Sequence, residues 1–334
     1  MKKIYYLFLL VLLAPSLVFA HVKWFVDSDE VIANSHGMTP FYSWGSKEVL
    51  TWSAIILVVV FIFSLIDKYA KSPKWLLSFG LNNEKSINRV SQAVLGIFLV
   101  TVSFIWNIIL VPNMPVENTT TSILQILQAL VGIMYILNIK PRIASILLLA
   151  FCIGLFWKQG FVALLENALL VSLALYFFIV NSRDTSTFAS WKKHAVEIVR
   201  IGTGVSLITL AFTEKLMYPE LSLDFLSLHH WNFMQPLFPW FTDKLFVLST
   251  GFAEMIFGIL FIFGYITRVT TVLIAIFFAC SVITMLTQFG KWEVEDLQVY
   301  SAAVLFIFYG HGKTKFFHLM WPNSKLQKEM LKTN

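Results

Sequence analysis

Long apolar runs fill most of the chain, and short polar stretches separate them. Nine of these runs have about the length of a helix that crosses a bilayer, which takes about 20 residues. They occupy residues 49–67, 89–111, 122–138, 143–158, 161–180, 198–217, 246–265, 268–287 and 298–311. The fourth and ninth runs are short for a full crossing. The pattern predicts an all-α, polytopic membrane protein.

Two of these regions resemble each other in sequence. Residues 128–142 (QALVGIMYILNIKPR) and 254–268 (EMIFGILFIFGYITR) both place a glycine four positions after the opening polar residue and an arginine fourteen positions after it. The flanking apolar runs also correspond. Residues 89–181 and 200–311 are therefore predicted to form two tandem four-helix transmembrane bundles.

The beginning of the chain is typical of a signal peptide. Lys2 and Lys3 precede an apolar stretch that ends in Val18-Phe19-Ala20, so we expect a signal over residues 1–20 with cleavage after Ala20. Without cleavage, the same stretch would be an additional anchoring helix. The other predicted parts are a periplasmic segment (21–48), one extra transmembrane helix with a cytoplasmic loop (49–88) and a basic cytoplasmic tail (312–334).

Composition and charge agree with this class of protein. With 57% hydrophobic and 13% charged residues, the chain is not an ordinary soluble domain. If the mature N-terminus is periplasmic, 17 lysines and arginines fall on the cytoplasmic side and six on the other. This bias predicts a bacterial inner-membrane protein with a cytoplasmic C-terminus, in contact with the lipid bilayer. The net charge of +6 then reflects orientation and indicates no nucleic-acid partner.

The second unit carries a pattern of charges and glycines that is similar to a known family. The pattern comprises Arg200-x-Gly202, Glu214-Lys215 and Glu254-x3-Gly258-x5-Gly264-x2-Thr267-Arg268. It resembles the DoxX family of small four-helix membrane proteins, which includes the DoxD and DoxA subunits associated with thiosulfate:quinone oxidoreductase. Residues 89–181 resemble it as a degenerate copy. The resemblance implies a membrane component of a quinone-linked electron-transfer or redox-stress system, with a soluble or membrane redox partner.

A charged pair inside the second unit is the main candidate site. Glu254 lies about 12 Å into its helix at the helical rise per residue, and a charge at that depth costs roughly 2.5 to 3.5 kcal/mol. We expect an ion pair between Glu254 and Lys215. Glu214 points about 100° away from Lys215 around the same helix, so we expect it to face another helix or the mouth of a pocket. These three are the candidate catalytic residues. The pair is either a structural clamp or a quinone-facing, proton-carrying site.

Three further groups of residues are weaker candidates. Arg268 either reaches lipid headgroups or helps to bind a cofactor. Glu293 and Asp296 belong to an acidic loop that either caps the last helix or binds a cation or proton, and the first unit has Glu166 there. The amine and imidazole of His21, exposed by cleavage, could chelate copper with His36 as a second imidazole, or this could be an ordinary periplasmic segment.

Missing motifs narrow the function further. The sequence contains no phosphate-binding loop, HExxH, nucleophile elbow, CxxCH or dinucleotide fingerprint. An enzyme that acts alone would need a cofactor that the chain does not obviously hold. Three function classes remain: the quinone-linked component, copper handling at the N-terminus, and a non-enzymatic scaffold or small-solute carrier.

Overall fold

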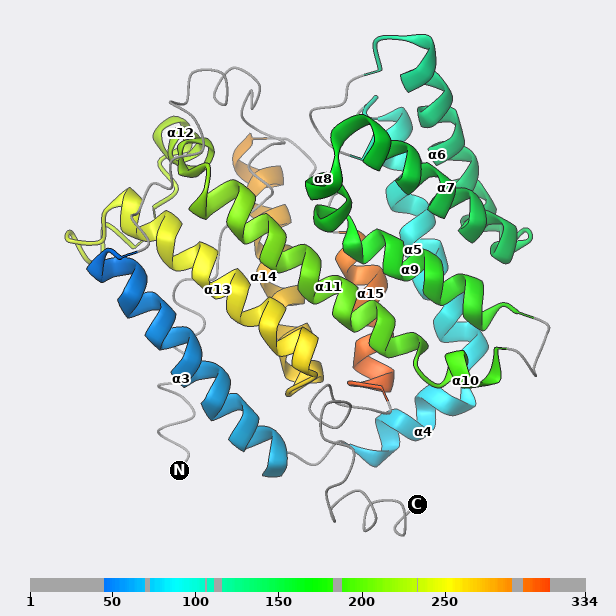
Figure 1. Ribbon diagram of the computed structural model, residues 1–334, viewed down its shortest axis with the longest axis horizontal. Helices are drawn as coiled ribbons and strands as arrows, with labels where there is room; N and C mark the ends of the chain where they lie inside the picture. The colour runs from blue at the N-terminus through cyan, green and yellow to red at the C-terminus, as the bar shows by residue number, and fades with distance from the viewer. Residues whose placement is uncertain are drawn as a thin grey trace.

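The computed structural model describes residues 45–69, 73–105, 107–110, 116–182, 188–232, 234–289 and 297–312, and their regular structure is helical (Figure 1). The helices are α3 (Lys47–Tyr69), α4 (Lys74–Asn82), α5 (Glu84–Phe104), α6 (Thr119–Leu137), α7 (Pro141–Gln159), α8 (Phe161–Glu166), α9 (Ala168–Val180), α10 (Ala189–Lys192), α11 (Ala195–Ala211), the π-helical segment η2 (Phe212–Leu216), α12 (Pro219–His229), α13 (Asp243–Phe263), α14 (Thr267–Phe289) and α15 (Leu297–Tyr309).

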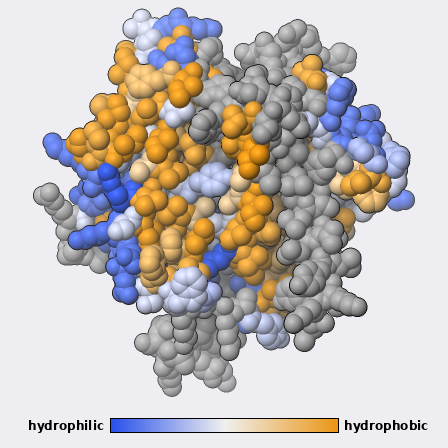
Figure 2. Space-filling view, turned by 180° about the vertical axis from the view of Figure 1, so that it is seen from behind, coloured by the Kyte–Doolittle hydropathy of each residue, from blue (hydrophilic) through white to orange (hydrophobic). Residues whose placement is uncertain are grey.

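Five of these helices are long and apolar enough to cross a membrane: α3, α5, α6, α11 with η2, and α13. Shorter apolar stretches lie in α7, α9, α14 and α15. Apolar side chains cover a broad area of the described surface (Figure 2). The prediction of an all-helical chain with several candidate membrane spans is therefore confirmed.

The two repeated units build the same close helix contact. A Cβ placed on Gly96 of α5 would lie 2.6 Å from the carbonyl oxygen of Gly132 on α6, and one on Gly204 of α11 would lie 2.5 Å from that of Gly258 on α13. Small residues let helices approach closely where lipid provides no hydrophobic drive for association. The glycines of the sequence repeat thus mark equivalent positions in the two units.

Arginines brace the same helix pairs in both units. Arg89 donates to the carbonyls of Tyr135 and Ile136, and Arg200 donates to those of Phe261 and Ile262. The carbonyls lie three and four residues beyond the glycine of each second helix. Each guanidinium adds a donor to carbonyls at a helix C-terminus, where the helix itself supplies too few amide partners.

The two units interlock, because the fourth helix of each packs against the other unit as well as against its own. Helix α9 packs extensively against α11, and α15 packs against α5, so the last helix of each unit lies on the first helix of the other. At these crossings Ser301 bonds Ser91, while Ser172 lies close to Gly202. One hydrophobic core cluster therefore includes residues from both units.

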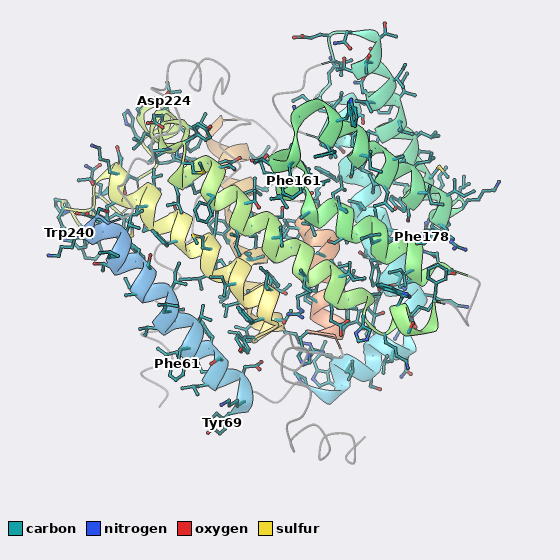
Figure 3. All side chains as sticks on the ribbon, viewed as in Figure 1. Phe61, Tyr69, Phe161, Phe178, Asp224 and Trp240 are labelled. Atoms are coloured by element: carbon teal, nitrogen blue, oxygen red, sulfur yellow. The ribbon has the colours of Figure 1, made fainter. Side chains whose placement is uncertain are left out.

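Helix α3 stands at the edge of the molecule and packs against α13 (Figure 1). Phe61 points away from α13 and is 61% exposed (Figure 3). At its C-terminal end, Asp67 accepts a hydrogen bond of 2.9 Å from the amide of Ile266, in the turn between α13 and α14. Tyr69 marks this end of the molecule, and Asp224 and Trp240 mark the opposite end (Figure 3).

The apolar run 161–180 is not one continuous helix. The structure divides it into α8 and α9 at Asn167, whose side-chain amide donates to the carbonyl of Ala163 at 2.8 Å. Asparagine side chains compete with helical backbone hydrogen bonds in this way. The division leaves Glu166 at the C-terminal end of α8, beside α11.

A candidate acid–base cluster

The candidate site begins where α11 changes its hydrogen-bond pattern. Beyond Ala211 the chain continues as η2, and the amide of Met217 donates to the carbonyl of Phe212, five residues earlier, at 2.8 Å. Such π-helical turns are rare and often occur at functional sites. Both Glu214 and Lys215 lie in this turn, and each is only 1% exposed.

Lys215 forms the expected ion pair with Glu254 on α13. The Lys215 Nζ lies 3.0 Å from both carboxylate oxygens of Glu254, and the two side chains are 2% and 13% exposed. Gly251, one turn earlier on α13, makes room for the lysine, because a Cβ there would lie 3.1 Å from the Lys215 Cβ. The sequence argument from depth therefore identified the correct partner.

Glu214 lies closer to this pair than the sequence predicted. Its Oε2 is 3.9 Å from Lys215 Nζ, so both carboxylates face one ammonium group. The prediction that Glu214 points elsewhere relied on the angle between adjacent residues of a helix, but the structure shows that these two long side chains still approach each other to 3.9 Å. We call Glu214, Lys215 and Glu254 the acid–base cluster.

The charge of this cluster has a chemical consequence. If all three groups are ionised, the cluster carries a net charge of minus one in a buried environment. A buried net charge is costly, and one bound proton removes it. Counted over these three groups alone, one bound proton balances the charge.

A short helix and loop cover the cluster at one end of the molecule. Ser222 on α12 donates from its hydroxyl to the carbonyl of Glu214 at 3.1 Å. The following loop is held in place by Asn232, whose amide donates to Asp243 Oδ1 and to the carbonyl of Phe241, both at 2.8 Å. This cover ties η2 to the start of α13.

The equivalent place in the first unit is neutral. Gln128 occupies the position of Glu254 and donates to Ser103 Oγ at 2.9 Å, while its Oε1 accepts from the amide of Leu110 at 3.1 Å. One turn earlier, the Gln125 amide donates to Asn107 Oδ1 at 2.7 Å. Amide side chains thus hold the first unit together where the second unit uses charges.

Glu166 was not among the predicted site residues, and the structure places it beside η2. The hydroxyl of Thr213 donates to Glu166 Oε1 at 2.7 Å, and the hydroxyl of Ser206 donates to the Glu166 backbone carbonyl. The sequence signal was an acidic residue followed by asparagine inside an apolar run. Its partners lie 40 and 47 residues away, so local pattern did not reveal the contact.

Of the other predicted site residues, the structure describes Arg268, and it contacts α15. Arg268, at the start of α14, donates to the carbonyls of Ile307 and Phe308 at 2.8 Å each and braces the end of α15. Glu293, Asp296, His21 and His36 lie outside the described residues. Within the described part of the chain, no group of three or more His, Cys, Asp or Glu side chains is placed to hold a metal ion.

No family model, no curated protein and no solved structure matches the chain. Membership of the DoxX family stays a prediction from the residue pattern. What the chain does must therefore be inferred from the geometry of the acid–base cluster and of the helices around it.

Proposed function

We propose that this protein is a DoxX-like membrane component of a quinone-linked electron-transfer or redox-stress system, and that the acid–base cluster exchanges protons with the quinone. The observation that carries the proposal is the convergence of two buried carboxylates on Lys215 Nζ, at 3.0 and 3.9 Å. Intramembrane ionisable residues commonly mark proton and substrate pathways.

The chemistry requires both electrons and protons. Reduction of a quinone to a quinol consumes two electrons and two protons, and oxidation returns them. A soluble or membrane redox partner supplies or accepts the electrons. This chain would contribute the proton at Glu254 or Glu214, with Lys215 stabilising the carboxylate that remains after the proton leaves.

The position of the cluster supports exchange with a ligand that dissolves in the bilayer. The side chain of Glu254 is 13% exposed, whereas that of Lys215 is 2% exposed. Its helix, α13, packs against α3 at the edge of the molecule. Glu254 is therefore the member of the cluster that a quinone would meet first.

Quinone binding by the purified protein in lipid nanodiscs tests the proposal. We expect a short-chain benzoquinone to quench tryptophan fluorescence saturably, and Glu254→Gln to weaken binding about tenfold, as loss of one charge-assisted hydrogen bond predicts. The matched control is Glu117→Gln, the same substitution at an exposed carboxylate of the first unit, which should bind like the wild type.

The same variants separate a site from a structural clamp. A folded Glu254→Gln protein that binds quinone like the wild type would refute the site. A Glu254→Gln protein that does not fold would show that the ion pair is a clamp. In that case Glu214→Gln, which leaves the 3.0 Å pair intact, becomes the variant that must alter proton exchange if the proposal is correct.

A further inference from the structure

Helix α4 (Lys74–Asn82) lies between two candidate membrane spans. The apolar pattern predicts a loop after the first span, but the structure forms a helix there, about 14 Å long at the helical rise per residue. It follows α3 and leads directly into α5, and both of these are long and apolar enough to cross a membrane. A short segment between two successive spans lies at or beyond one membrane surface.

Contacts between helix ends place α4 close to that surface. The ring of Phe79 stacks on that of Phe308, in the last turn of α15, with centroids 5.4 Å apart. Arg268, at the start of α14, donates to the carbonyl of Phe308, and Asp67, near the end of α3, accepts from the amide of Ile266. These helices therefore end at one level, which we call the Asp67 end, and α4 lies against it (Figure 1).

Helix α4 has a packed side and a polar side. Gly80 is buried against α15, because a Cβ there would lie 3.2 Å from the Phe308 Cβ. Ser78 and Asn82 lie four residues apart on the opposite side of the helix, and both are exposed. They form a polar strip that faces away from α15.

Large apolar side chains flank this polar strip. Trp75 and Phe79 share one flank and are 70% and 49% exposed, whereas Leu77 and Leu81 share the other and are 42% and 62% exposed. Exposure of these side chains to water is unfavourable. A polar strip between apolar flanks suits the boundary between lipid headgroups and acyl chains, where both kinds of side chain find favourable surroundings.

The charge near α4 complements a phospholipid surface. Residues 68–89 include five lysines and arginines and one acidic residue, Glu84. Lys68, at the end of α3, and Lys85, in the first turn of α5, are exposed on the two sides of α4 along the chain. Basic residues next to a span attract anionic headgroups. The exposed apolar flanks therefore lie beside charges that favour lipid.

Exposed tryptophans mark both ends of the molecule. Trp191 of α10 is 57% exposed, and α10 directly precedes the end of α11 that Arg200 ties to the end of α13. It therefore shares the Asp67 end with Trp75. Trp240 is 67% exposed at the opposite end (Figure 3). Tryptophan is enriched at both interfaces of a membrane, so Trp75 is placed as an anchor at one of them.

We propose that α4 is an interfacial helix that lies in the phospholipid headgroup layer at the Asp67 end. Its polar strip faces water, and its two apolar flanks reach about 5 to 10 Å into the boundary with the acyl chains. The partner of these flanks is the lipid of the bilayer that α3 and α5 cross. This inference goes beyond the proposed function, and it requires neither a quinone nor a redox partner.

Spin labels on the protein in lipid nanodiscs test the position of α4. Cys152 and Cys280 are first replaced by alanine, and circular dichroism checks that the helices are retained. Single cysteines then carry a nitroxide at Trp75 and Leu81, one on each flank, and at Ser78 on the polar strip. Relaxation measurements compare collisions with molecular oxygen, which concentrates in lipid, and with a water-soluble nickel chelate.

Two reference positions calibrate the measurement. Leu57→Cys, 73% exposed near the middle of α3, gives the value for lipid contact, and Glu117→Cys, at an exposed position before α6, gives the value for water. We expect Trp75→Cys and Leu81→Cys to fall between these references, with an oxygen-to-nickel ratio severalfold above that of Ser78→Cys. The Ser78→Cys label should resemble the Glu117→Cys label.

Two results would overturn the proposal. Ratios at both flanks equal to that of Glu117→Cys would show that α4 lies in water. Exclusion of both reagents at the flanks would show a protein partner, and dipolar broadening between labels would identify it as a second copy of the chain. If Trp75→Cys fails to fold, the comparison of Leu81→Cys with Ser78→Cys decides the question.

Discussion

Replacing Lys215 with methionine should destabilise the protein far more than replacing either of its carboxylate partners with glutamine. Methionine keeps most of the side-chain volume but removes the ammonium group that lies 3.0 Å from Glu254 and 3.9 Å from Glu214. Two carboxylates then lose the ammonium group that both of them face. Glu214→Gln has the opposite effect on charge, because it leaves the closer pair intact and removes the net negative charge.

The distances give the expected order of effects. At an effective dielectric constant of 20, a charge pair at 3.0 Å attracts with about 5.5 kcal/mol and one at 3.9 Å with about 4 kcal/mol, before desolvation is subtracted. Breaking a buried pair by removing one partner costs about 3 to 5 kcal/mol in practice. We expect that cost for Lys215→Met and about 1 to 2 kcal/mol for Glu254→Gln, which leaves Lys215 opposite Glu214. For Glu214→Gln we expect a change near zero.

The assay is reversible unfolding in mixed micelles of a mild detergent and dodecyl sulfate, followed by circular dichroism. The free energies of unfolding of Lys215→Met, Glu254→Gln and Glu214→Gln are compared with that of the wild type. Equal losses for Lys215→Met and Glu214→Gln would refute the reasoning, because the lysine would then not be the shared partner. A stable Lys215→Met protein would show that Glu214 and Glu254 are protonated or hydrated when the lysine is absent.

Three other changes test the helix contacts. Gly258→Ala should lower the free energy of unfolding by about 1 to 3 kcal/mol through overpacking, because the new Cβ would lie 2.8 Å from a backbone oxygen. The control is Gly154→Ala, which should have little effect on unfolding, because its Cβ would make an ordinary contact of 3.4 Å. Asp67→Ala should cost about 1.5 to 3 kcal/mol by removing a charged acceptor from the Ile266 amide, and Asp67→Asn, which keeps an acceptor oxygen, should cost less. Gln128→Glu should cost about 1 to 3 kcal/mol, because it removes the amide donor without adding a cation; unchanged unfolding would contradict a neutral, satisfied site in the first unit.

Much of the helical organisation could be predicted from the sequence. Apolar runs of about bilayer length fix where helices can form, because backbone groups in lipid must be satisfied within the helix. The repeat glycines Gly132 and Gly258 predicted equivalent positions, and the structure puts both at close helix contacts. The depth of Glu254 predicted its partner, because an isolated charge there is too costly and Lys215 was the nearest cation by depth.

The tertiary structure decided the composition of the site. Glu214 and Lys215 lie in the π-helical turn of η2, and a local shift from four-residue to five-residue hydrogen bonding leaves no apolar periodicity that would reveal it in the sequence. Whether the units stand apart or interlock depends on which helix faces pack together. Both faces of α9 and α15 are apolar, so their sequences do not indicate which face packs on the other unit. The contact between Glu166 and Thr213 spans 47 residues of sequence, so it exists only once α8 packs on α11. The sequence therefore determined the helices and the pair within one unit, while packing between the units determined which further groups reach that pair.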